Sequence, residues 1–224
     1  MALYKGTTKI KSIYKGTTKI AKIYKGTTLI YSASKLPNAF QEVEYIESSK
    51  TQYIDTGLHL TATTGVMLDI QFTGYANQQA IGVLEPSVGR FAPCFMDSDN
   101  YIKCAINLQN QMITYTQTGP LDRNVYEYNI SNNDIKFNGT SIGTVGNIGT
   151  SSNTIYLFGR NYQASPLLSS AKLYSCKIYD NNTLARDFVP CYRKADNVAG
   201  LYDLVNGVFY TNAGTGTFIV GCNV

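Results

Sequence analysis

Three carboxylates lie close together in the sequence, at Glu42, Glu44 and Glu47. Hydrolysis of a glycosidic bond with retention of configuration needs two carboxyl groups about 5 to 5.5 Å apart, one as nucleophile and one as general acid. Residues two apart on a strand share a face, so Glu42 and Glu44 meet that condition, whereas Glu47 needs a β-bulge. Solvated carboxylates on an edge strand, which also deter wrong strand pairing, are the simpler interpretation. We therefore expect no catalytic residue here.

The remaining chemistry-bearing residues form no recognisable catalytic or metal motif. His59 is the only histidine and has no nucleophile motif to serve, which argues against a catalytic triad. Asp97, Asp99, Asp180 and Asn181 offer hard oxygen atoms, but the sequence after Asp97 departs from a calcium-binding loop at its fifth and twelfth positions. Asx-rich turns explain these residues, with calcium binding as the alternative. We expect no metal and no cofactor.

Aromatic and amide side chains gather in two loop-like stretches. A sugar is bound through an aromatic face that covers its apolar side and through polar neighbours that orient its hydroxyl groups. Local packing of these tyrosines on a sheet is the simpler interpretation. The candidate glycan-binding residues are Tyr75, Asn77, Gln79, Asn161, Tyr162 and Gln163.

Composition favours a β-rich chain with a sizeable core. The 224 residues fit one large domain or one domain with an appendage; only 15% are charged, while 18 are Tyr, 9 Phe and none Trp. No apolar run is long enough to span a membrane, and the first residues lack the apolar segment of a secretory signal. The five cysteines are an odd number without a C-x-x-C pair, so we expect free thiols in a protein that folds in a reducing cytoplasm.

A ten-residue repeat occupies the beginning of the chain. The pattern Tyr-Lys-Gly-Thr-Thr occurs three times, starting at Tyr4, Tyr14 and Tyr24. Lys-Gly is a turn signal and the segments between are β-branched, which predicts a short meander with strands such as residues 8–14. Residues 1–35 hold eight lysines and no acidic residue, yet the lysines are periodic, so we expect a solvated strand face and no nucleic-acid partner.

A ribbon this small cannot bury enough apolar surface by itself. We therefore expect the repeats to pair with other copies of the chain, as a trimer, or to add strands to a host protein. A flexible lysine-rich tail is the alternative. The residues expected to anchor and oligomerise are Tyr4, Ile10, Ile13, Tyr14, Ile20, Ile23, Tyr24 and Ile30.

The rest of the chain is a series of short strands separated by turn residues. We expect a β-repeat arm at residues 1–33, a linker at 34–39 in which Pro37 stops strand continuation, and a single domain at 40–224. Turn signals at Asn138-Gly139, Asp180-Asn181-Asn182 and Asn206-Gly207 predict hairpins. Helices should be at most a turn or two, which indicates an all-β, antiparallel two-sheet jelly-roll sandwich. The expected strands are residues 42–46, 53–55, 66–72, 80–84, 90–96, 101–107, 112–116, 124–130, 135–137, 154–159, 171–179, 184–190, 201–204, 208–210 and 217–220.

Several segments carry a family resemblance. They are residues 36–49 (LPNAFQEVEYIESS), 51–57 (TQYIDTG), 171–180 (AKLYSCKIYD), 186–193 (RDFVPCYR) and 200–212 (GLYDLVNGVFYTN). Together they resemble the laminin-G-like, concanavalin A-like jelly-roll domains of tail, fibre and head-decoration proteins in phages of gut bacteria. The triplet at 42–47 is also similar to the E-x-D-x-x-E signature of jelly-roll β-glucanases, although Glu44 stands where that family has Asp.

The resemblance implies a role in attachment. It suggests a non-catalytic virion protein, folded in the bacterial cytoplasm, whose repeats resemble the virion-anchoring end of phage proteins. The partners would be further copies of the chain, other virion proteins and a glycan of the host surface, with no membrane insertion. The alternative is a carbohydrate-binding adhesin or a glycan-cleaving depolymerase of the glucanase-like class. The fold hosts lectins, hydrolases and inert decorations alike, so function must be argued from the site.

Overall fold

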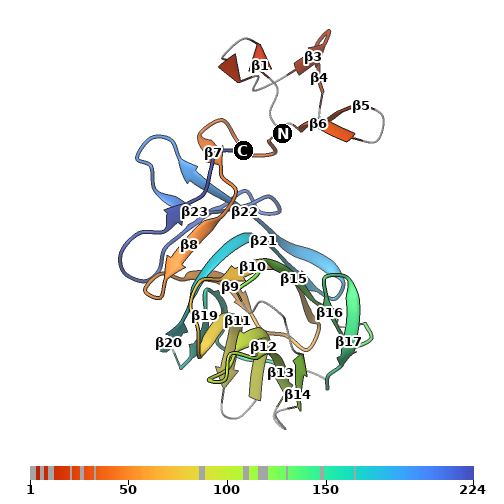
Figure 1. The fold of residues 1–224 in the computed structure, drawn as a ribbon, viewed down its shortest axis with the longest axis vertical. Coiled ribbons are helices and arrows are strands. Elements are labelled where there is room, and N and C mark those ends of the chain that lie inside the picture. Colours follow the sequence, from red (N-terminus) through yellow and green to blue (C-terminus); the bar gives the residue numbers. More distant parts are fainter. Residues whose placement is uncertain are drawn as a thin grey trace.

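The chain folds as an all-β protein with two antiparallel sheets packed face to face (Figure 1). The structure is a computed structural model, and it describes all residues except 1–3, 6–7, 10–12, 21, 26–27, 33, 86–88, 108–110, 116–120, 130, 147–148 and 164. No helix occurs among the described residues, so none of them belongs to a helix that could cross a membrane. The predicted jelly-roll-like sandwich is confirmed.

The first sheet has eleven strands and follows the order β17-β16-β15-β10-β21-β22-β23-β24, with β8 on β21, β25 on β8 and β7 on β22. Asn138-Gly139 and Asn181-Asn182 form the two-residue turns of its β16–β17 and β21–β22 hairpins at positive φ, as their residue types predict. Its strands are β7 Phe40–Glu42, β8 Ile46–Ser49, β10 Thr64–Phe72, β15 Asn124–Asn129, β16 Asp134–Phe137, β17 Thr140–Thr144, β21 Ser170–Asp180, β22 Thr183–Arg193, β23 Ala199–Asp203, β24 Phe209–Thr211 and β25 Ile219–Val220.

The second sheet has eight strands in the order β14-β13-β12-β11-β18-β9, with β19 on β11 and β20 on β19. All its pairs are antiparallel except β11–β19, which is parallel. Its strands are β9 Ile54–His59, β11 Gln78–Glu85, β12 Gly89–Met96, β13 Ile102–Asn107, β14 Gln111–Tyr115, β18 Thr154–Leu157, β19 Gly159–Tyr162 and β20 Ser165–Leu168.

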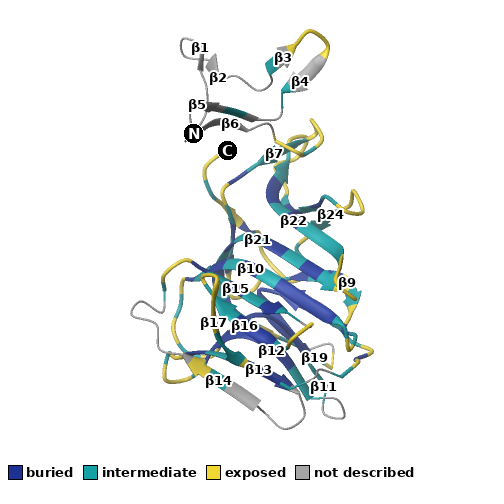
Figure 2. Ribbon diagram, turned by 90° about the vertical axis from the view of Figure 1, so that its right-hand side faces the viewer, coloured by how far each residue is buried: buried dark blue, intermediate teal, exposed yellow. Residues whose placement is uncertain are grey.

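One apolar core fills the space between the two sheets. In β15 buried and half-buried residues alternate, as expected of a strand with one face on a core. The ring of Phe91 on β12 lies 6.2 Å from that of Tyr128 on β15, which joins the sheets directly. Figure 2 shows the buried residues concentrated in these central strands.

Strand β21 is shared between two neighbours. Its first half, from Ser170 to Leu173, pairs with β8, while its second half, from Cys176 to Asp180, pairs with β22. The far end of β22 is then free to pair with β23 and β7. The C-terminal strands therefore extend the first sheet beyond the sandwich, toward the N-terminal arm (Figure 1).

The arm forms three separate hairpins, not the predicted meander. The hairpins pair β1 (Tyr4–Lys5) with β2 (Thr8–Lys9), β3 (Ile13–Lys15) with β4 (Thr18–Ile20), and β5 (Lys22–Lys25) with β6 (Thr28–Ser32). In the second repeat Gly16 and Thr17 join paired Lys15 and Thr18, and Gly16 has φ +63°. Glycine at the first turn position matches the two-residue type II′ turn that closes a hairpin within one repeat. The proposed division at residues 33 and 40 stays a prediction.

The predicted strand over residues 42–46 is interrupted. β7 ends at Glu42, Val43 makes a single bridge to Asn223, and β8 begins only at Ile46. The amide of Glu44 donates to the carbonyl of Cys222 and the amide of Val224 to the carbonyl of Glu42, so the C-terminal segment runs antiparallel beside residues 42–45. Glu42, Glu44 and Glu47 consequently do not share one strand.

Candidate functional site

The second sheet is buried on both faces over part of its area. Residues 78–83 of β11 and 91–96 of β12 are buried without alternation. The outer face of a sandwich sheet usually meets water and alternates polar with apolar residues. Here the outer face carries its own apolar cluster, formed by Ala92, Phe95 and Ala105, separate from the main core. Side chains of the second sheet therefore shield part of its own outer face from water.

A groove of about 960 Å³ lies over the enclosed area. This volume is within the range of roughly 300–1,000 Å³ that is typical of small-molecule sites. Pairing across β11, β12 and β13 places Gln79, Phe95 and Lys103 in one row. Apolar residues 166–168 of β20 also line the groove. A depression over β10 and β15 of the first sheet is smaller, at about 170 Å³.

Two arginines in the groove lack counterions. Arg160 is 6% exposed and Arg90 is half-buried, and the Nε atom of each is buried without a hydrogen-bond partner among the described residues. Neither guanidinium forms an ion pair within the described part of the chain. Burial, and then the charge of Arg90, lower the pKa of Arg160 to about 10. Burial also lowers the pKa of Arg90. Arg160 is still protonated at neutral pH, since 7 lies well below its pKa.

The strands place these arginines on either side of β11. Arg160 lies on β19, which runs parallel to β11, and Arg90 lies on β12, opposite Leu84 of β11. Between them, a Cβ atom at Gly82 would lie 2.3 Å from the carbonyl oxygen of Phe91, so this position requires glycine. The guanidinium carbon of Arg90 is 5.6 Å from the ring centre of Phe95, a cation–π distance.

Gln79 adds a hydrogen-bonding group to the groove. Its side chain is 8% exposed, and its Oε1 atom has no hydrogen-bond partner. Its backbone is fixed by fully buried Ser169, whose hydroxyl accepts from the Gln79 amide and donates to the Gln79 carbonyl oxygen at 2.7 Å. A side-chain acceptor without a partner, on a backbone fixed at the groove, is suited to a ligand hydroxyl or amide.

Two loops form one end of the groove. The side-chain amide of Gln78 donates to the carbonyl oxygens of Tyr75 and Ala76, at 2.8 and 2.9 Å, and holds this loop to the sheet. The amide of Asn77 donates to the carbonyl of Asp97 at 3.1 Å, which joins the loop to the turn after β12. The Asp97 carboxylate is ion-paired with Lys103.

The predicted glycan-binding residues are only partly brought together. Asn77 and Gln79 line the groove, and Tyr75, 57% exposed, lies on the loop beside them. Asn161 is buried and its side-chain amide donates to the carbonyl of Thr154 at 2.9 Å, so it serves the fold. The other two residues of the second stretch, half-buried Tyr162 and exposed Gln163, are outside the groove lining.

The other candidate residues are dispersed. Exposed His59 ends β9, opposite Thr154 of β18. Asp180 accepts hydrogen bonds from the hydroxyl groups of Thr61 and Thr63, at 2.7 and 2.5 Å. No group of three acidic, histidine or cysteine residues suited to a metal ion occurs in the part of the chain that the structure describes.

The arm residues expected to oligomerise are described only in part. Ile10 lies outside the described residues, and so do the side chains of Tyr4, Tyr14, Tyr24 and Ile30. The side chains of Ile13, Ile20 and Ile23 are half-buried. Their role in self-association stays a prediction.

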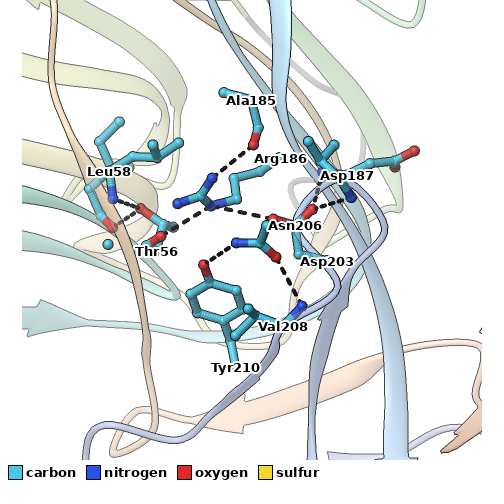
Figure 3. A network of polar contacts seen from close by, with 12 residues as sticks. Thr56, Leu58, Ala185, Arg186, Asp187, Asp203, Asn206, Val208 and Tyr210 are labelled. Carbon is cyan, nitrogen blue, oxygen red and sulfur yellow. Dashed lines mark hydrogen bonds and ion pairs between the residues drawn. The ribbon is translucent and has the colours of Figure 1, made fainter. Parts of the chain in front are cut away.

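The other arginines of the protein each have a carboxylate partner. Arg123 binds both carboxylate oxygens of Asp69, at 2.9 and 2.8 Å, and stacks 3.6 Å from the ring centre of Tyr174. Arg186 contacts the carboxylate of Asp203 and donates to the carbonyl of Ala185 at 2.8 Å (Figure 3). Both arginines stabilise the first sheet, in contrast to the pair in the groove.

Sequence reasoning missed the two groove arginines. Each stands next to apolar residues of a strand, in Gly89-Arg90-Phe91 and Phe158-Gly159-Arg160, where a charged side chain is rare unless paired. An isolated arginine in an otherwise buried strand was the available signal. Placing Arg160 in the groove requires the pairing of β19 with β11, which no local sequence pattern reveals.

Replacing Arg160 with methionine should stabilise the ligand-free protein. The change removes a buried, unpaired charge while keeping a long apolar stem, so we expect about 1 kcal/mol of added stability. For a chain of this size that corresponds to a rise of about 2–4 °C in the thermal midpoint. Thermal unfolding followed by circular dichroism measures it. Arg186→Met, which removes a partnered guanidinium, should lower the midpoint; a lower midpoint for Arg160→Met would show that Arg160 stabilises the fold.

Comparison with known proteins supports the fold. A similar solved structure is that of a candidate carbohydrate-binding protein from Bacteroides ovatus ATCC 8483, with a TM-score of 0.52 and 11% sequence identity. The similarity covers 88% of this chain and 65% of that protein, so the chain spans less than two thirds of its length. No protein-family model matches the sequence, and no curated protein matches it either.

Proposed function

We propose that this chain is a non-catalytic attachment protein that binds a carbohydrate in the groove over β11, β12 and β13. The observation that carries the proposal is the set of unpaired polar groups of Gln79, Arg90 and Arg160, which line the same groove as the ring of Phe95. Fixed polar groups next to an aromatic ring are the chemistry that orients a sugar. The structural similarity to a candidate carbohydrate-binding protein agrees with this choice.

The proposal extends to the setting in which the protein acts. The resemblance to phage fibre and decoration proteins supports a place on a virion, with the N-terminal repeats as the anchoring and oligomerising end. Several copies displayed together would compensate for weak single-site binding, because linked sites raise the effective concentration. A non-catalytic role is favoured over a depolymerase because Glu42, Glu44 and Glu47 lie on separate elements.

A glycan array tests the binding function. The wild-type chain should retain at least one class of glycan, and Gln79→Leu should weaken that binding by about tenfold, the effect of one lost hydrogen bond. Gln163→Leu is the matched control, because Gln163 is exposed and outside the groove lining. An array without any bound glycan, or equal losses in both variants, would contradict the proposal. Sugar release that disappears in Glu42→Gln or Glu47→Gln would instead establish the enzyme.

A further inference from the structure

The groove carries an excess of positive charge. Lys50, Arg90, Lys103 and Arg160 line it, against the carboxylates of Asp97 and Asp99. Lys103 and Asp97 neutralise each other as an ion pair. Asp99 is exposed, on the turn after β12, whereas the two arginines lie on the strands that flank β11. Uncompensated positive charge therefore remains at exposed Lys50 and, on the strands of the sheet, at Arg90 and Arg160.

The position of these two guanidinium groups is unfavourable without a ligand. Each is partly removed from water, each has a buried Nε donor without an acceptor, and the charge of Arg90 acts on Arg160. Buried cations in proteins are ordinarily paired with carboxylates. Glu85 also lies on β11, but its carboxylate accepts a hydrogen bond from the hydroxyl of Ser151. An anion bound in the groove beside the two guanidinium groups would compensate their charge and remove the repulsion.

We infer that the groove recognises an acidic saccharide, with a sugar carboxylate held between Arg90 and Arg160. This inference rests on the proposed carbohydrate-binding function and names the class of sugar. A guanidinium presents a planar fork of N–H donors that matches a carboxylate in bidentate fashion. Gln79 and the ring of Phe95 stand beside the arginines and bind the neutral part of the sugar. Apolar residues 166–168 of β20 line the groove beyond them.

Matched glycans test the inference directly. The probes are oligosaccharides that contain uronic acid, the same oligosaccharides with each carboxyl group reduced to an alcohol, and sulfated oligosaccharides. Wild-type protein should bind at least one uronic acid oligosaccharide at least about tenfold more tightly than its reduced form, because the hydrogen bonds concerned are charge-assisted. Arg160→Gln should lose that preference and bind acidic and reduced forms equally.

The control variant is Arg193→Gln, which makes the same change of charge at an exposed arginine paired with Asp196 outside the groove. It should keep the wild-type preference. If Arg160→Gln fails to fold by circular dichroism, Arg160→Lys replaces it, since lysine keeps the charge and removes the bidentate fork. An equal loss of preference in Arg160 and Arg193 variants would indicate general charge attraction and overturn the inference.

The remaining outcomes separate the two proposals. Equal binding of acidic and reduced oligosaccharides by the wild type overturns the acidic-sugar inference and leaves the carbohydrate-binding function standing. A preference for sulfated over uronic acid oligosaccharides also overturns the carboxylate assignment. Failure to bind any saccharide of any class overturns both proposals.

Discussion

Replacing Asp203 with alanine should lower the free energy of unfolding by about 3–5 kcal/mol, because it leaves half-buried Arg186 without its counterion and two backbone amides without their acceptor. Asp203 is fully buried, and its Oδ1 atom accepts hydrogen bonds from the amides of Asp187 and Val205, at 2.9 and 3.0 Å. Its Oδ2 atom lies 3.4 Å from Nε of Arg186, an ion-pair distance without hydrogen-bond alignment (Figure 3). Alanine removes all three interactions at once.

Urea unfolding of the variant and of the wild-type chain measures this loss. Asp196→Ala is the control: Asp196 pairs with Arg193 at 2.6 Å, but both side chains are 42% exposed. A solvent-exposed pair of this kind contributes little to stability, so the control should leave the free energy of unfolding almost unchanged. Comparable effects of the two substitutions would show that the Asp203 network does not hold the C-terminal strands.

Deleting residues 1–33 should convert a multimer into a monomer. Isolated two-stranded hairpins are marginally stable in water, and each of the three hairpins forms a sheet of its own whose described residues pair with no further strand. Association with other copies would cover the edges of these hairpins and the half-buried Ile13, Ile20 and Ile23. Light scattering coupled to gel filtration should give a multiple of 24.7 kDa for the full chain and a single truncated chain after the deletion.

Point variants separate apolar association from attraction between charges. Ile23→Lys should dissociate the multimer, because a charged side chain replaces a half-buried apolar one, whereas exposed Lys15→Gln should leave it intact. A full-length chain that is monomeric at micromolar concentration would disprove the oligomerisation proposal. The glycan-binding proposal does not depend on this result.

Local sequence pattern was sufficient for the fold class and for most strands of the sandwich. Alternation in residues 124–129 and turn residues at Asn138-Gly139 are local signals, and the structure follows them. Residues 154–159 were expected as one strand, but β18 ends at Leu157, and Phe158 adopts φ +63° before β19 begins. The sequence does not predict β20, which lines the groove, because this short strand is stabilised by its pairing with β19 and carries no strand pattern of its own.

The segments that carry the family resemblance explain the fold better than the function. Arg186 belongs to one such segment and Asp203 to another, and together they tie the β23–β24 turn to β22 and, through the 3.3 Å hydrogen bond from Arg186 to Thr56, to β9. The groove residues Arg90 and Arg160 lie outside all of these segments. The sequence resemblance therefore predicts the fold, whereas the candidate site is identified only from the burial and the unpaired charges of residues in the structure.

The distribution of thiols makes the native protein convenient for single-site chemical labelling. Cys222 is exposed, while Cys94, Cys104, Cys176 and Cys191 are buried. Burial raises the pKa of these four thiols, to about 12 for Cys191, and the thiolate is the form that reacts with maleimides. A fluorophore should therefore attach at Cys222 alone, next to β25 of the first sheet, and leave the groove of the second sheet free for fluorescence measurements of saccharide binding.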